Sequence, residues 1–309
     1  MISAFLRETI HPRQHRIDYA GSLLMVVAVG SAITLLIQGS VLSHGVMLAL
    51  AAICGVTLAA LARHETRTPE PMVAVELLRD RVILIGSLGG GLAGAVMMGV
   101  SAFLPSYVQG AMGRSAMTAG LVLGAMSVTW AVSSILGGRL MVRTSYRLAA
   151  LLGALSLMAG SAMLLGLTPE RGVVWATAAS FTIGVGMGLC NTAFIVSIQA
   201  AVAWNKRGAA TSCCLFLRFI GQALGAASFG SVLNATMKRH GPDTAHLIDQ
   251  LMEPGTRALL APAERAELIA LIAGGLHNAY WLAMALSAVT LALVWFLPAR
   301  LSPAHQSLR

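Results

Sequence analysis

The sequence predicts an all-α protein, a polytopic membrane bundle of eight transmembrane helices. Hydrophobic residues make up 57% of the 309 residues, and charged residues make up only 11%. Soluble globular proteins carry about 25% charged residues, so these charges are too few to coat a soluble surface. Apolar runs long enough to cross a bilayer as a helix, about 20 residues each, recur along the chain. The two observations together place the chain in the lipid bilayer.

The expected spans follow one another from residue 19 to residue 298. Lipid offers the backbone no hydrogen-bond partner, so each span must be a helix. The spans run over residues 19–39, 42–62, 82–108, 117–137, 148–167, 173–201, 209–234 and 277–298.

The first two spans stand apart from the other six. A charged segment that contains two prolines, RHETRTPEPMVAVELLRDR, joins them to the third span. We therefore expect residues 1–81 to hold an N-terminal cytoplasmic segment, two linker helices and a connector, and residues 82–309 to form a six-helix bundle. Spans three to five and six to eight make two sets of three. Because three is odd, the second set is inverted relative to the first, as in transporters built from inverted repeats.

Basic residues between the spans predict the orientation. Fourteen of the 21 arginines and lysines fall on the side of the two termini, and six fall on the opposite side. Arg139, Arg143 and Arg147 belong to the first group and mark a cytoplasmic loop. The positive-inside rule then places both termini in the cytoplasm, and we expect a multi-pass protein of the cell's inner membrane.

Residues 235–276 then form an external loop. Two amphipathic helices are expected in it, one through DTAHLIDQLM and one through PAERAELIALIAGG. The second begins at Pro262, a residue suited to the first turn of a helix. We expect both helices to lie on the outer membrane surface or to cover the ends of the spans.

A lone arginine interrupts the apolar stretch SCCLFLRFIGQALG, residues 212–225. Arg218 lies about nine residues into its span, roughly 13 Å at ~1.5 Å per residue, near the middle of a ~30 Å hydrocarbon core. A charge there costs at least ~2.5–3.5 kcal/mol, so the side chain must face the bundle interior or a wet cavity. Either Arg218 lines a translocation path and attracts polar or anionic substrate groups, or it bonds backbone carbonyls or snorkels to the cytoplasmic interface.

Polar and small residues on this span and its neighbours extend the candidate site. Gln222 falls on the same face of the helix as Arg218. Further candidates for the wall of a substrate cavity are Asn191, Gln199, Met98 and Ser101. Glycines favour close helix crossings or hinges, and the candidates for that role are Gly90, Gly94, Gly184, Gly188, Gly221 and Gly225.

Other classes of function find no support in the sequence. The net charge of +9 comes from basic residues in short loops, which argues against nucleic acid as a partner. The four cysteines lack the spacing of metal ligands or of a disulfide framework. No metal site, cofactor site or enzyme motif such as GxSxG or HExxH is found, so an enzyme is not expected. The twelve acidic residues lie in loops or at span edges, which leaves no carboxylate deep in a span to carry a proton.

Several segments resemble the 14-helix drug:proton antiporter branch of the major facilitator superfamily. They are HRIDYAGSLL, ELLRDRV, FLPSYVQGAMGRSAMTAGLVLG, GRLMVRTSYR and IQAAVAWNKRGAATSCCLFLRFIGQALGAASFG. The most specific block is RGAATSCCLFLRFIGQALG, because the family carries an arginine where Arg218 stands. Two departures concern the cytoplasmic gate: Val142 stands near a place where the family often has an acidic residue, and LGAMSVTW lacks a proline that is common in the fourth span.

The resemblance implies multidrug export by alternating access, with a small-molecule substrate, a proton gradient as the energy source and no cofactor. Members of this branch have six N-terminal helices, two linker helices and six C-terminal helices, and this chain resembles the last eight. The family's coupling carboxylates lie largely in the other half. The chain is therefore expected to be the C-terminal part of such a transporter. The alternatives are a truncated or degenerate non-transporting membrane protein, or a half-transporter that needs an N-terminal partner chain.

Overall fold

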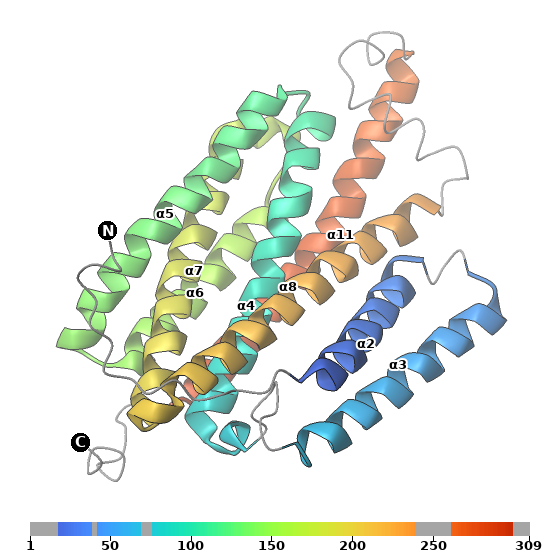
Figure 1. Cartoon of the computed structure of the whole chain (residues 1–309). Coiled ribbons are helices and arrows are strands. Elements are labelled where there is room, and N and C mark those ends of the chain that lie inside the picture. The colour runs from blue at the N-terminus through green and yellow to red at the C-terminus, as the bar shows by residue number, and fades with distance from the viewer. Residues whose placement is uncertain (1–17, 39–41, 69–75, 239–260, 299–309) are drawn as a thin grey trace, which may run out of the picture.

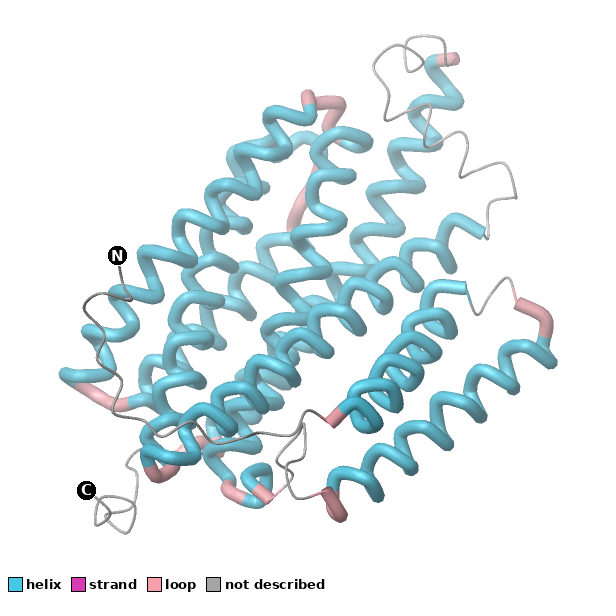
Figure 2. Tube along the Cα trace, in the orientation of Figure 1, coloured by secondary structure: helices cyan, strands magenta, loops and turns pink. Residues whose placement is uncertain are grey.

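The computed structural model describes residues 18–38, 42–68, 76–238 and 261–298. Over these residues the regular structure is entirely helical, as the sequence predicts (Figure 2). Eight of the helical segments are long and apolar enough to cross a membrane. The long helices are α2 (Tyr19–Gln38), α3 (His44–Glu65), α4 (Arg81–Ser106), α5 (Ala116–Arg143), α6 (Tyr146–Leu165), α7 (Gly172–Ala201), α8 (Arg207–Lys238) and α11 (Pro262–Trp295).

Polar side chains fix the starts of three of these helices. The Asp80 carboxylate accepts a hydrogen bond from the Val82 N–H, 2.8 Å away, at the start of α4. Ser115 and Ser145 accept in the same way at the starts of α5 and α6. Such caps satisfy N–H groups that the first turn of a helix leaves without partners. Short polar connections between long apolar helices therefore also set where these three spans begin.

Five pairings of helices make up most of the bundle. Helix α4 packs against α8, α7 packs against both α5 and α6, and α11 packs against α6 and α4 (Figure 1). Helices α2 and α3 pack on each other at the side of the bundle, where α2 contacts α8.

The pairing pattern is the one expected of two inverted three-helix sets. The first helix of each set, α4 or α7, packs against the second helix of the other set, α8 or α5. Exchanging the two sets turns one of these pairs into the other, as an inverted repeat requires. The division into residues 1–81 and 82–309 stays a prediction that this pattern supports.

Helix α4 ends in an irregular turn. Pro105 lies in its last turn, and residues Tyr107–Ala111 form a single π-helical turn, η2. Proline removes one backbone donor, and a local change of helix type re-satisfies the carbonyl that this leaves. The Tyr107 hydroxyl, buried here, donates to the carbonyl oxygen of Leu167 at 3.0 Å and ties this turn to the segment after α6.

The expected external loop is shorter than residues 235–276. Residues 235–238 end α8, and residues 262–276 belong to α11, which runs without a break from Pro262. Pro262 does occupy the first turn of its helix. The expected helix through DTAHLIDQLM lies outside the described residues.

Packing explains why the second expected amphipathic helix is part of a span. Its apolar residues Leu268, Leu271 and Ile272 are buried in the core. A Cβ on Gly275 would lie 2.8 Å from Leu233 of α8. The apolar stripe therefore faces the bundle and not the membrane surface, and the Gly274–Gly275 pair continues the helix where α8 approaches it.

Candidate functional site

Arg218 lies in α8, on the part of this helix that crosses α4 and faces α7. Its Nη1 donates a 2.5 Å hydrogen bond to Oδ1 of Asn191 on α7. Its guanidinium carbon lies 5.3 Å from the centre of the Phe219 ring, within the range of a cation–π interaction. The Nε atom is buried and has no hydrogen-bond partner among the described residues. Within the described residues, Arg218 thus pairs with a neutral side chain on a neighbouring helix.

Glycines let α4 and α8 approach closely beside Arg218. A Cβ on Gly94 would lie 3.0 Å from the carbonyl oxygen of Arg218 and 3.1 Å from Cγ of both Arg218 and Gln222. A Cβ on Gly221 would collide with the Gly91 backbone, and one on Gly225 would lie 2.5 Å from the Cα of Ala95. The stems of Arg218 and Gln222 therefore rest directly on the glycine face of α4.

The six cavity candidates do not form one cluster. Arg218 and Asn191 are joined by a hydrogen bond, and Gln222 follows Arg218 by one helical turn. Gln199 instead donates a 3.1 Å hydrogen bond to the Thr211 hydroxyl, about two turns from Arg218 toward the start of α8.

The two α4 candidates follow Gly94, which faces Arg218. The side chain of Met98 is 40% exposed, and Ser101 is half-buried nearly one turn further along α4. The structure joins Arg218 to Asn191 by a hydrogen bond, and the roles of Gln222, Gln199, Met98 and Ser101 in a cavity wall stay predictions.

A second close contact joins α5 and α7. A Cβ on Gly184 would collide with Thr129 and with the Met126 carbonyl, and one on Gly188 would collide with Ser133 and with the Trp130 carbonyl. The contact at Gly90 is less close, because the nearest atom to a Cβ there would be the Cys214 sulfur, 3.8 Å away. Five of the six glycine candidates thus lie where even an alanine would meet a neighbouring helix.

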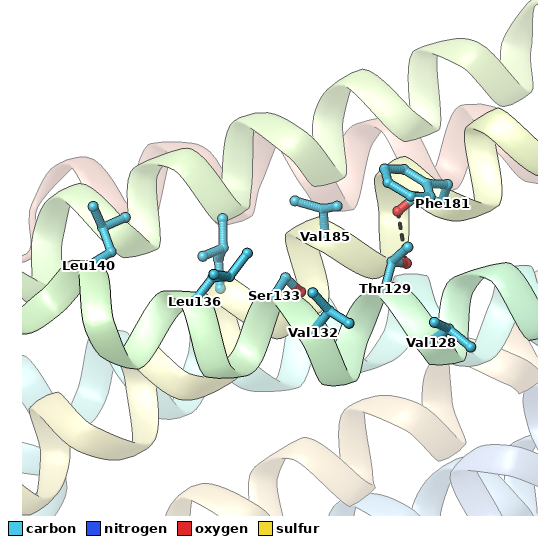
Figure 3. A pocket seen from close by; sticks show the side chains of 9 residues that line it. Val128, Thr129, Val132, Ser133, Leu136, Leu140, Phe181 and Val185 are labelled. Carbon is cyan, nitrogen blue, oxygen red and sulfur yellow. Dashed lines mark hydrogen bonds between the residues drawn. The ribbon is translucent and has the colours of Figure 1, made fainter.

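Hydroxyl groups on α5 face these glycines, a feature that the sequence analysis missed. The Thr129 hydroxyl lies 3.1 Å from the carbonyl oxygen of Phe181 on α7, and the Ser133 hydroxyl lies 3.3 Å from that of Gly184 (Figure 3). Each hydroxyl also lies within hydrogen-bond distance of a carbonyl of its own helix, so its single proton is shared. The signal was available: Thr129 and Ser133 are four residues apart, as are Gly184 and Gly188.

An apolar groove of about 530 Å³ runs along the same two helices (Figure 3). Val128, Val132 and Leu136 line one side of it from α5, and their side chains are exposed by 52–64%. Phe181, Val185 and Leu189 line it from α7. Apart from the Thr129 and Ser133 hydroxyls the groove offers no polar group, so it suits another helix or an acyl chain.

The three loop arginines lie together where α5 ends and α6 begins. Arg139 and Arg143 are exposed at the end of α5. Arg147 is half-buried in the first turn of α6, and its guanidinium carbon lies 5.4 Å from the centre of the Trp295 ring on α11.

A polar contact also joins the linker helices at their ends. The Asp18 carboxylate, which is 6% exposed, lies 2.8 Å from Nε2 of His64 and accepts a second hydrogen bond from the Gly21 N–H. The pKa of Asp18 lies below its usual value of 3.8. The main cause is the hydrogen bond from the Gly21 N–H, and the second is the hydrogen bond with His64. Asp18 therefore both begins α2 and binds the end of α3.

Metal-binding and redox features are not found in the described part of the chain. No three histidine, cysteine or acidic side chains there are placed to hold a metal ion. The four cysteines, which all lie in described segments, are unpaired thiols, and Cys190, Cys213 and Cys214 are buried.

The sequence of this chain is similar to those of known proteins. Residues 2–226 match the family model of the Major Facilitator Superfamily. Multidrug resistance protein 3 of Bacillus subtilis is 27% identical over 243 residues, which are 75% of this chain and 46% of that protein. Methylenomycin A resistance protein of Streptomyces coelicolor is 29% identical over 228 residues, 72% of this chain and 48% of that protein. The chain spans about half the length of the curated relatives that it matches.

A solved structure shares the arrangement of helices. It is a bacterial homologue of the human lysosomal transporter Spinster, crystallised in an inward-facing and unoccupied conformation. The TM-score is 0.56 and the identity 18%, over 91% of this chain and 69% of that one. This likeness concerns the fold alone, while the family match covers most of the sequence. The chain therefore belongs to the major facilitator superfamily and is a multi-pass membrane protein.

Proposed function

We propose that this chain forms the C-terminal part of a multidrug efflux transporter of the 14-helix branch, which works by alternating access in the inner membrane. The observation that carries the proposal is the Arg218–Asn191 pair within two membrane-spanning helices. A charge at this depth is costly and marks a functional position by default. The names of relatives such as multidrug resistance protein 3 and methylenomycin A resistance protein support drugs as the substrate class.

Arg218 would bind or orient the substrate, or hold one state of the transporter closed. Its hydrogen-bonding capacity is not used up here, because Asn191 accepts only one bond and Nε has no partner among the described residues. A guanidinium has five N–H donors. A substrate or a helix of the other half that offers an acceptor would therefore gain a charge-assisted hydrogen bond. Gln222, one turn further along α8, would extend the same polar strip.

The remaining features fit a half of a larger transporter. The acidic residues of the described spans lie near span ends, as Glu65, Glu264 and Glu267 do. A carboxylate that couples transport to a proton gradient would thus come from helices beyond this sequence, and the length of the relatives leaves room for them. The exposed groove between α5 and α7 offers an apolar face for such helices. The excess of basic residues supports cytoplasmic termini.

The test uses the product of the natural gene, including any coding sequence that continues upstream of Met1. Cells that express it are loaded with ethidium, and the rate of dye loss is measured for the wild type and for Arg218→Gln. We expect efflux to fall at least tenfold, because the variant keeps a polar side chain but loses the charge. Arg171→Gln is the matched control, since Arg171 lies in the 3₁₀-helical turn at the very start of the sixth span and not in its middle. Unchanged efflux by Arg218→Gln at equal expression would remove Arg218 from the mechanism.

A second candidate is a membrane protein that does not transport alone, either a degenerate protein or a half-transporter that needs a partner chain. The absence of an acidic side chain in the middle of the described spans favours it. The chain reconstituted alone in vesicles decides between the two. If it moves a fluorescent cationic dye against a gradient when a proton gradient is applied, the second candidate is excluded.

A further inference from the structure

Two arginines from different helices flank the end of α11. The guanidinium carbon of Arg81, at the start of α4, lies 5.8 Å from the centre of the Phe296 ring. That of Arg147, at the start of α6, lies 5.4 Å from the centre of the Trp295 ring. Trp295 and Phe296 are consecutive, so both cations lie at one helix end. We call these four residues the basic aromatic end.

The two cations have no anionic partner in the described structure. The ion pair found among the described residues joins His64 to Asp18, at the linker helices. Nε of Arg147 is buried without a hydrogen-bond partner among those residues. Stacking on an aromatic ring leaves the edge of a guanidinium free to donate, and two such edges suit the oxygens of a phosphate.

The aromatic side chains place this cluster at the edge of the bilayer. Trp295 is 63% exposed and Phe296 is 58% exposed, although both end a membrane-spanning helix. Tryptophan at the end of a span is typical of the interface between lipid headgroups and acyl chains. Basic pockets between the ends of spans are a recurrent binding site for anionic headgroups.

Apolar surface continues from the cations toward the membrane interior. Leu148, Leu152 and Leu155 follow Arg147 along one side of α6 and are exposed by 40–44%. A free phosphate or a soluble anion would gain nothing from these leucines. A phospholipid would contact them with its acyl chains while its phosphate meets the arginines.

We propose that the basic aromatic end binds one anionic phospholipid, with its phosphate between Arg81 and Arg147 and its glycerol backbone beside Trp295. Nothing in this site depends on substrate transport, so lipid binding is measured separately from efflux. Binding is electrostatic at the headgroup, and it weakens as the salt concentration rises.

The first experiment measures binding of phosphatidylglycerol and phosphatidylcholine to the purified full chain in detergent, by native mass spectrometry. We expect the wild type to prefer phosphatidylglycerol. The double variant Arg81→Gln/Arg147→Gln should bind it about thirtyfold more weakly, at roughly fivefold per arginine near the surface. Arg171→Gln is the matched control: Arg171 also stacks on a tryptophan, at 4.6 Å from the Trp175 ring, but lies between the end of α6 and the start of α7, at the opposite end of α6 from Arg147. It should keep the wild-type preference.

The outcomes separate the proposal from its rivals. Equal binding of the two lipids by the wild type overturns it, and so does a double variant that keeps the preference. Glycerol phosphate, which has a phosphate but no acyl chain, should not compete at the same concentration. If it competes fully, the site is a general anion site and the assignment to a phospholipid is wrong.

A second measurement does not depend on whether the arginine variants fold. Phosphatidylglycerol with brominated acyl chains quenches the fluorescence of nearby tryptophans, and the chain has five. The difference between the wild type and Trp295→Phe isolates Trp295. We expect brominated phosphatidylglycerol to quench this component more than brominated phosphatidylcholine does. Equal quenching by the two lipids would contradict a headgroup-selective site.

Discussion

A Cβ on Gly221 of α8 would collide with the backbone of Gly91 on α4, so the two helices meet backbone to backbone at this point. The crossing lies one turn beyond Arg218 on α8. It fixes the height and rotation of the arginine relative to α4. Close approach through small residues is the usual source of affinity between helices in lipid, where the hydrophobic effect cannot drive association.

We therefore predict that Gly221→Ala destabilises the bundle by about 3 kcal/mol or more, at the upper end of overpacking costs, because the backbone cannot move aside as a side chain can. Thermal unfolding of the purified chain in detergent measures it. Gly124→Ala is the control, since nothing lies within 4 Å of a Cβ there. It should be neutral or stabilising by up to about 1 kcal/mol. Equal effects of the two changes would mean that α4 and α8 do not cross at Gly221.

The Arg218–Asn191 hydrogen bond should appear as an energetic coupling. Asn191→Ala and Arg218→Gln, made singly and together, form a double-mutant cycle on the free energy of unfolding. A hydrogen bond to a charged group is worth about 1.5–3 kcal/mol, and we expect a coupling in that range. Strictly additive single effects would show that the two side chains do not interact in the folded protein.

The hydroxyl groups between α5 and α7 should contribute less to the free energy of unfolding than the Arg218–Asn191 hydrogen bond does. Thr129→Val removes the hydroxyl and keeps the shape of the side chain, and we expect a loss of about 0.6 kcal/mol, the average for hydrogen bonds between membrane helices. Ser127→Ala is the control, because Ser127 is exposed and its hydroxyl donates to the Leu123 carbonyl of its own helix. Equal losses of stability in the two variants would contradict a stabilising contact of the Thr129 hydroxyl with α7.

Asp18 should make the attachment of α2 to α3 depend on pH. Its pKa lies below 3.8 in the folded chain because the Gly21 N–H and His64 stabilise the carboxylate. A lowered pKa adds stability above the unfolded value, and that stability is lost as the pH falls through the folded pKa. Asp18→Asn should therefore lower the unfolding temperature at pH 7, and the gap to the wild type should narrow below about pH 4. A gap that stays constant down to pH 3 would contradict this assignment.

The sequence predicted most of the fold because the bilayer leaves few choices. Apolar runs had to be helices, and their approximate bounds followed from the extent of each run. The capping side chains that set the exact starts, such as Asp80 and Ser115, were not singled out in the sequence. The helical period placed Arg218 and Gln222 on one face of their helix. It did not show which residue the arginine would contact, because a partner such as Asn191 depends on the crossing of α7 and α8.

The expectation of a separate surface helix over residues 262–275 was wrong because the position of a neighbouring helix was missing. The sequence cannot tell an apolar stripe that faces lipid from one that faces α8. The place of Met98 in a cavity wall stays a prediction: α8 covers Gly94, Ala95 and Gly99 of α4, and Met98 lies beside this contact with 40% of its surface exposed.

The unbroken length of α11 has a mechanical consequence. Its 34 residues extend about 51 Å at 1.5 Å per residue, against a hydrocarbon core of about 30 Å. In Figure 1 the start of this helix rises beyond its neighbours. A stiff rod anchored at its lower end is a lever, and a tilt of about 10° moves its far end by about 9 Å. A spin label or fluorophore near Pro262 would therefore magnify small rotations of the bundle into displacements large enough to measure.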